Sequence, residues 1–245
     1  MAEHYYQTYH GSNARKTVLV VTPTMDGPFL QEAIQSVQQQ ETQYTFDHLL
    51  VYDGVQPKVT RGILPPNIKK MVLPWNTGKN GFYGHRIYAS ISHLVDHDVI
   101  LFLDEDNTYT KNHIESLVNY FALDATCSFT YSMRNIMDED GKFICVDRFE
   151  SIGEAGASRL VDTSSYAFDR KFLIRAGHIW NHGWGADRRF FQYVYAHEKY
   201  YQTQTPTLNY RLGGNPGSPN RLFFLQGNEQ AGWTPDGLHR NKEIS

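Results

Sequence analysis

The sequence predicts an α/β fold in which a mostly parallel sheet is flanked by helices. In the first half of the chain, short apolar runs alternate with longer segments whose apolar residues recur at helical spacing. Residues 99–103 are five consecutive apolar residues, which is typical of a strand buried on both faces of a parallel sheet. With 245 residues, of which 40% are hydrophobic, the chain is long enough for one large α/β domain.

The first half reads as four strands with helices between and after them. The first strand is β-branched and apolar, and the first helix carries Leu30, Ala33, Ile34 and Val37 on one face. Helical segments of about ten to fifteen residues between strands imply βαβ units with right-handed crossovers. The predicted strands are 17–21, 48–52, 69–73 and 99–103, and the predicted helices are 29–40, 82–94 and a third around 114–121.

The second half is less regular. It predicts a hairpin of 126–133 and 143–146, a strand at 164–168, a short helix at 170–176, and a loop at 182–187 that leads into a further helix. From residue 202 onward, prolines and paired glycines predict an irregular, partly mobile segment. No linker divides the chain, so we predict a single domain over 1–245, composed of a 17–124 half, a 125–212 half and a tail at 213–245 that we expect to be mobile.

Composition excludes several classes of protein. A formal net charge of −3 gives no general attraction to nucleic acid or to an anionic membrane. The two cysteines, Cys127 and Cys145, are typical of small buried side chains in a reducing compartment. Residues 1–16 lack the apolar core of a signal peptide, and no run approaches the length of a membrane span. We therefore predict a cytoplasmic protein with no transmembrane segment and no nucleic-acid partner; association through a surface helix and the oligomeric state stay open.

Three polar clusters follow three of the predicted strands. They are Thr22-Pro23-Thr24, Asp53-Gly54 and Asp104-Glu105-Asp106. Ligands of parallel sheets bind outside the carboxyl ends of the strands, so the clusters are expected to meet at one edge. Three adjacent carboxylates repel one another unless a cation lies between them, and Mg²⁺ or Mn²⁺ bridging to a phosphate is the usual occupant of such an oxygen-rich site. The alternative is a polar loop that merely follows a strand.

Several familiar motifs are absent. The glycines Gly78, Gly81 and Gly84 do not form a dinucleotide fingerprint after the first strand, and no phosphate-binding P-loop occurs. The paired histidines His93 and His97 lack the glutamate that a zinc protease needs between them. These absences disfavour nucleotide-dependent dehydrogenases, P-loop enzymes and zinc proteases.

The motifs that are present resemble, in order, those of the GT-A glycosyltransferases, family 2 in particular. The resemblance covers about residues 17 to 212. It rests on Val20-Val21-Thr22-Pro23-Thr24-Met25, Val51-Tyr52-Asp53-Gly54-Val55, Asn76-Thr77-Gly78-Lys79 with Arg86, Phe102-Leu103-Asp104-Glu105-Asp106-Asn107, and Gly183-Trp184-Gly185-Ala186-Asp187.

This resemblance implies a GT-A fold and a metal-dependent, inverting transfer of a sugar from a nucleoside-diphosphate sugar to a hydroxyl acceptor such as a glycan. UDP is the commonest nucleotide in the family. Asp106 would be the direct ligand of Mn²⁺ or Mg²⁺ with Asp104 beside it, and Asp187 would be the general base. The 17–124 half would bind the nucleotide sugar and the 125–212 half the acceptor, which would lie against Trp184 and Gly185. Nucleotide-sugar binding is implied for Thr22, Pro23, Thr24, Asp53, Lys79, Arg86, Asp104 and Glu105.

The chain departs from the family pattern at three points. Tyr52 stands where many members have an aspartate, and Ala186 replaces a glutamate beside the base. No histidine follows Tyr210-Arg211, which leaves His197 and His239 as candidate third metal ligands. The replacements at Tyr52 and Ala186 keep open a second hypothesis, a non-catalytic module that binds a sugar nucleotide or a glycan. A nucleotidyltransferase is disfavoured because residues 25–28 do not form a loop rich in glycine and arginine.

Overall fold

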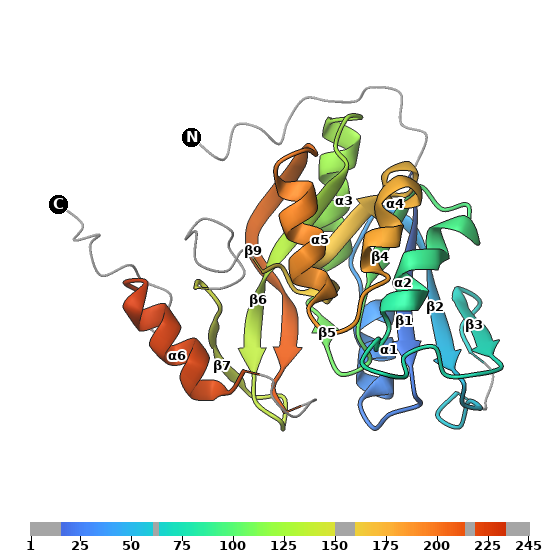
Figure 1. Cartoon of the computed structure of the whole chain (residues 1–245), viewed down its shortest axis with the longest axis horizontal. Coiled ribbons are helices and arrows are strands. Elements are labelled where there is room, and N and C mark those ends of the chain that lie inside the picture. Colours follow the sequence, from blue (N-terminus) through green and yellow to red (C-terminus); the bar gives the residue numbers. More distant parts are fainter. Residues whose placement is uncertain (1–15, 61–63, 150–159, 214–218, 234–245) are drawn as a thin grey trace.

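The computed structural model of the protein describes residues 16–60, 64–149, 160–213 and 219–233 (Figure 1). These residues form a nine-stranded mixed sheet with the order β3-β2-β1-β4-β8-β6-β9-β5, in which β7 pairs with β6. The strands are β1 (Thr17–Thr24), β2 (Thr45–Asp53), β3 (Ile68–Leu73), β4 (Val99–Phe102), β5 (Thr108–Tyr109), β6 (Phe129–Met137), β7 (Phe143–Val146), β8 (Tyr166–Asp169) and β9 (Tyr200–Arg211).

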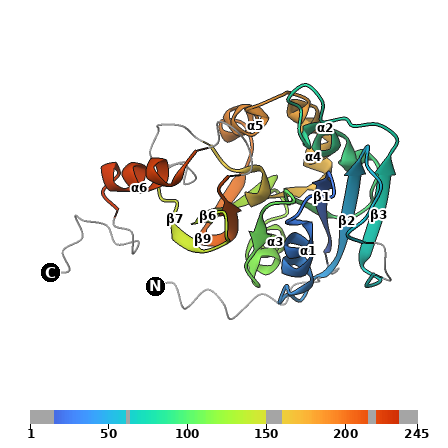
Figure 2. The same ribbon diagram turned by 90° about the horizontal axis from the view of Figure 1, so that it is seen from below.

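Helices cover both faces of the sheet (Figure 2). One core lies between the sheet and α2, α4 and α5, and a second core lies between the sheet and α1 and α3. The helices are α1 (Leu30–Gln38), α2 (His85–Ser90), α3 (His113–Leu123), α4 (Arg170–Ala176), α5 (Ala186–Tyr195) and α6 (Arg221–Gln230), with the 3₁₀ turns η1 (Ile91–His93), η2 (Thr163–Ser165) and η3 (Gly177–Trp180). The fold is the predicted α/β class. No helix among the described residues has both the length and the apolar character that crossing a membrane requires.

The parallel part of the sheet follows the sequence prediction. Strands β3, β2, β1 and β4 are all parallel, and the side chains of β4 are fully buried, as the unbroken apolar run requires. In the register of these strands, Thr24 lies beside Tyr52, and Val21 lies beside Phe102. The residues that follow β1, β2 and β4 therefore come together at one edge of the sheet.

The second half continues the same sheet with a change of direction. Strand β8 is antiparallel to both β4 and β6, and the predicted hairpin is formed by β6 and β7. The strand predicted at 164–168 begins two residues later, because Thr163–Ser165 form the 3₁₀ turn η2. The helix predicted over 82–94 is shorter: α2 is six residues long and continues only as the 3₁₀ turn η1.

The prediction of an irregular segment from residue 202 was wrong for 202–211. These residues belong to β9, which pairs in parallel with β6 and antiparallel with β5. The polar run Gln202–Thr205 and Pro206 hid the strand signal. The ladder shifts register at this point, so Pro206 lies at an irregularity, where a strand tolerates a residue without an amide hydrogen.

Part of the predicted tail is a helix. The side chain of Asn220 caps α6 by accepting a hydrogen bond from the amide of Phe223 at 3.0 Å. Phe224 of this helix packs into a small core with Ile136, Cys145 and Leu212. Residues 214–218 and 234–245 of the tail lie outside the described residues, so its mobility stays a prediction.

Candidate functional site

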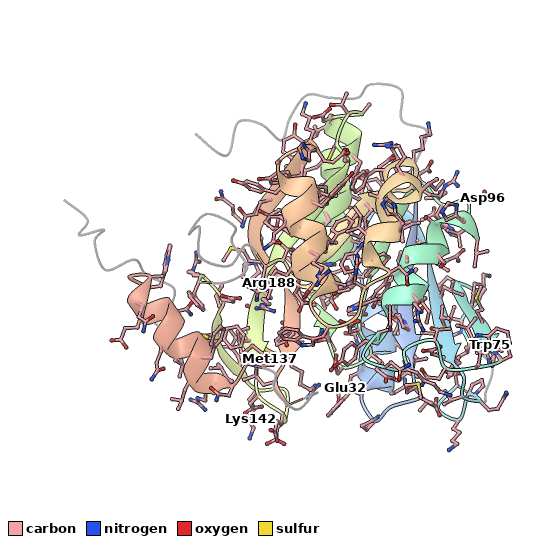
Figure 3. The ribbon with its side chains drawn as sticks, viewed as in Figure 1. Glu32, Trp75, Asp96, Met137, Lys142 and Arg188 are labelled. Atoms are coloured by element: carbon pink, nitrogen blue, oxygen red, sulfur yellow. The ribbon has the colours of Figure 1, made fainter. Side chains whose placement is uncertain are left out.

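The carboxyl ends of β1, β2 and β4 open onto a cavity of about 680 Å³. Its walls come from both halves of the chain. Trp75 and Met137 mark opposite ends of the edge at which the parallel strands finish, and Arg188, a further lining residue, lies above Met137 in the first turn of α5 (Figure 3). Nine predicted site residues line the cavity: Pro23, Thr24, Asp53, Asp104, Glu105, Asp106, Trp184, Gly185 and Asp187.

The acidic loop after β4 is held in place by two side chains from other elements. The amide of Asp104 donates to Ser164 Oγ at 3.0 Å, and Asn107 Nδ2 donates to the same oxygen at 3.2 Å. On the other side, Arg211 Nε donates to the main-chain carbonyl of Asp106 at 3.2 Å. The Asp104 carboxylate accepts a hydrogen bond from the hydroxyl of Tyr88 at 2.7 Å. The loop thus has a defined course that brings the Asp104 and Asp106 side chains to the cavity wall.

Glu105 has a different task from its two neighbours. Its carboxylate accepts hydrogen bonds from Thr24 Oγ1, from the amide of Met25 at 3.2 Å and from the amide of Gly27 at 2.9 Å. Three contacts to one loop fix the turn between β1 and α1. Glu105 lines the cavity, but its oxygens are engaged in shaping the wall.

Asp53 also shapes a loop. Its two carboxylate oxygens accept hydrogen bonds from the amides of Thr77, at 2.7 Å, and Gly78, at 2.8 Å. The loop passes so close to Gly54 that a β-carbon there would lie 2.3 Å from the amide nitrogen of Asn76. Two buried oxygens of this loop, Asn76 Oδ1 and Thr77 Oγ1, have no hydrogen-bond partner. Such orphaned atoms beside a cavity are candidate contacts for a ligand.

Three predicted binding residues are not among those that line the cavity. Thr22 lies two residues before the end of β1, where it is fully buried, and its hydroxyl contacts His48 Nε2 at 2.9 Å. Arg86 donates to the carbonyl of Thr77 at 2.9 Å, and its guanidinium lies 3.6 Å from the centre of the Phe82 ring. Arg86 therefore supports the neighbouring loop, and Lys79 is an exposed lysine on that loop.

The residues predicted to contact the acceptor, Trp184 and Gly185, lie with Asp187 where a loop enters α5. Gly185 has a φ of +82°, which favours glycine, and Asp187 follows in the first turn of the helix. Asp187 Oδ1 accepts a hydrogen bond from the amide of Arg188 at 2.7 Å. Trp184 is 79% exposed at the cavity. His85 Nδ1 donates to the carbonyl of His182 at 2.9 Å, which ties this loop to α2.

The sequence analysis missed a buried ion-pair network beside the cavity. Arg134 of β6 is only 2% exposed and pairs with Asp147 at 2.9 Å and with Asp162 at 3.2 Å. Arg134 and Asp162 both line the cavity. The sequence signal for this network was Arg134 itself, an arginine one residue beyond the end of the predicted strand 126–133.

One candidate third metal ligand, His197, is exposed and is not among the residues that line the cavity. The other, His239, lies outside the described residues. Within the described ranges, no group of three or more histidine, cysteine, aspartate or glutamate side chains is arranged to hold a metal ion. Asp104 and Asp106 therefore stand as a pair.

The sequence model of glycosyl transferase family 2 matches residues 19–194, from β1 to near the end of α5. This chain belongs to glycosyl transferase family 2. The matched region contains all the acidic residues that line the cavity. No curated protein matches the chain.

Solved structures share the fold of this chain. S. aureus TarS 1–349 superposes with a TM-score of 0.59 at 15% identity, over 80% of this chain and 60% of that chain. The same fragment in complex with UDP gives 0.59 at 14% identity, over 81% and 61% of the two chains. Its complex with UDP-GlcNAc gives 0.60 at 14% identity, over 84% and 62%. The chain thus spans about three fifths of the length of those fragments, with the GT-A arrangement that the motifs predicted.

Electrostatics distinguish the carboxylates of the cavity. Burial, with Asp106 and Asp162 nearby, raises the pKa of Asp104 to about 8, although the Tyr88 hydrogen bond opposes this rise. Burial and Asp162 raise the pKa of Asp106 to about 6, against the effect of Arg211. Burial and Asp162 also raise the pKa of Asp187. Burial is thus the main cause of all three rises, and neighbouring carboxylates add to it.

Proposed function

We propose that this chain is a glycosyltransferase that moves a sugar from a UDP-sugar to a hydroxyl of a glycan, with Mn²⁺ or Mg²⁺ and with inversion at the anomeric carbon. The observation that carries the proposal is that Asp104, Asp106 and Asp187 line a single cavity, although about 80 residues of chain separate the pair from Asp187.

The residues present fit a divalent cation. Asp104 and Asp106 offer hard oxygen ligands, and their pKa values are raised first by burial and then by neighbouring carboxylates, whose repulsion a cation would relieve. Two protein ligands suit Mg²⁺ or Mn²⁺, which commonly complete their coordination with water and substrate phosphates. When bound, the ion would stabilise the negative charge that develops on the departing diphosphate.

The loop after β3 is suited to the nucleoside. Asp53 holds this loop through two amides, and Asn76 of the loop lines the cavity with its Oδ1 lacking a hydrogen-bond partner. A uracil base carries one N–H donor that such an acceptor could bind. The choice of UDP also rests on the similar fold of TarS, which has been solved with UDP and with UDP-GlcNAc.

Asp187 is the proposed general base. Its carboxylate takes the proton of the acceptor hydroxyl while that oxygen forms a bond to the anomeric carbon, and the bond from that carbon to the diphosphate oxygen breaks. Attack opposite the leaving group inverts the anomeric centre. The raised pKa of Asp187 suits this task, because a base works best when its pKa approaches the working pH.

Aromatic side chains at the cavity suit a sugar acceptor. Trp184 is 79% exposed and Tyr83 is 44% exposed, and both line the cavity. Their loops touch, since a β-carbon on Gly183 would lie 3.1 Å from the carbonyl oxygen of Gly81. An exposed indole at a cavity can pack against the apolar face of a pyranose ring.

The two departures that suggested a non-catalytic module lie away from the cavity. Ala186 is fully buried in the core beneath α5. Tyr52 is fully buried against Leu30 and Ile34, with its hydroxyl bonded to Thr60. Neither position lines the cavity, so neither replacement removes a carboxylate from it.

The test combines ligand binding with turnover. Thermal unfolding is measured with UDP-GlcNAc and other UDP-sugars, with and without Mn²⁺, because a ligand that binds the native state raises its melting temperature. Release of UDP is then measured with a panel of oligosaccharide acceptors. The variants are Asp106→Asn and Asp187→Asn, and the matched control is Asp96→Asn, which removes an exposed carboxylate far from the cavity (Figure 3).

We expect Asp106→Asn to lose the stabilisation that depends on both Mn²⁺ and the donor. Asp187→Asn should keep that stabilisation but transfer sugar about 100-fold more slowly or worse, since a general base contributes about 10²–10⁴-fold. Undiminished transfer by Asp187→Asn would exclude it as the base. Equal donor binding by Asp106→Asn and the wild type would exclude the metal site.

A further inference from the structure

We infer that Arg211 is a positioning residue that fixes the main chain at Asp106, and so holds the Asp106 carboxylate where the cation and diphosphate of the donor bind. The inference rests on the proposed function, because it assigns a task to the residue that supports the proposed metal ligand.

Arg211 holds the acidic loop with both its main chain and its side chain. It is the last residue of β9, and its amide donates to Asn107 Oδ1 at 3.0 Å. Its Nε donates to the carbonyl oxygen of Asp106 at 3.2 Å. Both hydrogen bonds reach the same two-residue stretch of a loop that belongs to neither strand β4 nor strand β5.

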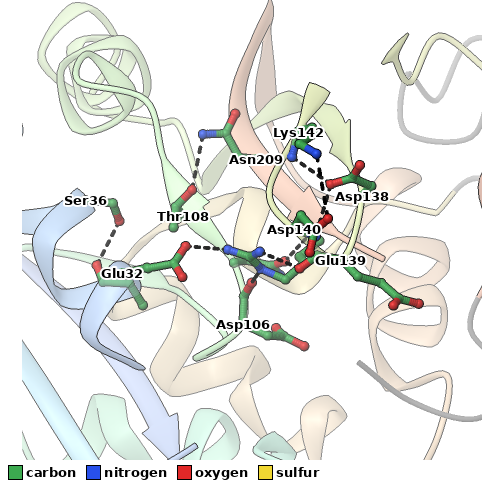
Figure 4. Close-up of polar contacts among 12 residues, drawn as sticks. Glu32, Ser36, Asp106, Thr108, Asp138, Glu139, Asp140, Lys142 and Asn209 are labelled. Carbon is green, nitrogen blue, oxygen red and sulfur yellow. Dashed lines mark hydrogen bonds and ion pairs between the residues drawn. The ribbon is translucent and has the colours of Figure 1, made fainter. Parts of the chain in front are cut away.

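The rest of the guanidinium is fixed by Glu139, Glu32 and Phe29, of which Figure 4 labels Glu32 and Glu139. One terminal nitrogen donates to the carbonyl of Glu139, in the turn between β6 and β7, at 2.9 Å. The other forms an ion pair with the carboxylate of Glu32 on α1. The guanidinium carbon lies 4.3 Å from the centre of the Phe29 ring. Arg211 is 8% exposed, so this arrangement leaves its planar group little freedom to turn.

This geometry suits positioning of the Asp106 side chain rather than its neutralisation. Arg211 binds the carbonyl of Asp106, and the described structure pairs no cationic side chain with the Asp106 carboxylate itself. The carboxylate therefore remains available for a metal ion. Ser164 holds the loop through the amide of Asp104 and the side chain of Asn107, and Arg211 holds it through the carbonyl of Asp106.

A lysine at this position separates positioning from charge. Arg211→Lys keeps the positive charge, but one ammonium group cannot donate along the three separate directions that Nε and the two terminal nitrogens now serve. If the role of residue 211 is only to supply positive charge, lysine should replace arginine without loss. If its role is to fix the loop, lysine should fail.

The experiment titrates UDP-GlcNAc by calorimetry at several Mn²⁺ concentrations, for the wild type, Arg211→Lys and Glu32→Gln. We expect Arg211→Lys to weaken Mn²⁺-dependent donor binding about 10-fold, since a hydrogen bond that involves a charged group typically contributes about that factor. In Glu32→Gln the hydrogen bond from Arg211 to Asp106 remains, and only the ion pair between Arg211 and the partly exposed Glu32 is lost. We therefore expect Mn²⁺-dependent donor binding to weaken about 2-fold. Binding of UDP without Mn²⁺ should change by less than about 2-fold in both variants.

Glu32→Gln also serves if Arg211→Lys does not fold, because the Glu32 side chain is 54% exposed and its loss should leave the core intact. Lys111→Gln, which removes an exposed ion pair with Glu41, is the control and should bind as the wild type does. If the wild type shows Mn²⁺-dependent binding and both variants match it, the inference is wrong while the proposed function stands. If the wild type itself binds no UDP-sugar with Mn²⁺, the proposed function fails and the inference fails with it.

Discussion

The carboxylates at the cavity are chemically alike, and their partners give them different tasks. Glu105 is bound by a hydroxyl and two amides of one loop, whereas Asp104 accepts a hydrogen bond from Tyr88. Asp187 lies at the start of a helix, where burial and Asp162 raise its pKa. A carboxylate engaged by amides shapes the protein, and one that is buried near other carboxylates is ready to bind a cation or a proton.

The variant Tyr88→Phe tests whether the hydrogen-bond partner of Asp104 sets the pKa of this carboxyl. In Tyr88→Phe the ring still stacks on Phe102, at 4.1 Å between ring centres, but Asp104 loses a hydrogen bond that favours its charged form. The pKa of Asp104 should rise further, so Mn²⁺-dependent donor binding should require a higher pH. The measurement is donor affinity against pH. Tyr44→Phe, which loses a hydroxyl contact to Asn119 away from the cavity, is the control.

Trp184 provides a prediction for the acceptor. Because the indole is 79% exposed, Trp184→Ala should leave the melting temperature nearly unchanged. The KM for a glycan acceptor should rise about 2–10-fold, in line with the stabilisation that an aromatic contact provides, and the KM for the donor should not change. An unchanged acceptor KM would exclude stacking on this ring.

At the level of the elements, two loops that follow parallel strands are held in place by side chains from neighbouring strand ends. Glu105, after β4, holds the loop after β1, and Asp53, at the end of β2, holds the loop after β3. Each loop is thus braced by a side chain from a neighbouring strand end. These loops form the part of the cavity wall that comes from the first half of the chain. Removing a side chain that holds one loop should change the conformation of that loop.

Glu105→Ala tests this bracing. The amides of Met25 and Gly27 would lose their acceptor. A hydrogen bond to a charged group typically contributes about 1.5–3 kcal/mol to the free energy of unfolding. We expect the melting temperature to fall by several degrees and donor affinity to fall about 10-fold. Glu41→Ala, which removes an exposed ion-pair partner of Lys111, should change neither quantity. If donor affinity survives in Glu105→Ala, the loop after β1 does not depend on this carboxylate.

At the scale of the whole molecule, the mixed sheet joins two halves of the chain at one cavity. Antiparallel β8 lies between β4 and β6, so the second half continues the sheet beside the acidic loop instead of forming a separate body. Arg134 on β6 then pairs with Asp162 at the cavity wall. The resulting concentration of carboxylates couples the stability of the protein to pH.

The pKa values of Asp104 and Asp106, about 8 and about 6, both lie above the ordinary aspartate value of 3.8. The folded state therefore binds more protons than the unfolded state between about pH 4 and pH 8, and the contribution of these groups to stability is lost as pH rises through that window. Without metal, the melting temperature should fall from about pH 5 to about pH 8.5, and it should fall less in an Asp104→Asn, Asp106→Asn double variant. Mn²⁺ should raise the melting temperature at the higher pH in the wild type alone. Identical pH profiles for the two proteins would contradict the raised pKa values.

Local apolar patterns and turn residues were enough to predict the four parallel strands, the hairpin and the three polar clusters at the strand ends. Family motifs also predicted Asp104, Asp106, Asp187 and Trp184 at a common site. The polar, proline-containing residues 202–211 became strand β9 only through long-range pairing, since their contacts with β6 and β5 outweigh a weak local preference. Likewise, Arg211 and Arg134 acquire their roles from partners far along the chain, and no local pattern records which side chains the fold will bring within hydrogen-bond distance.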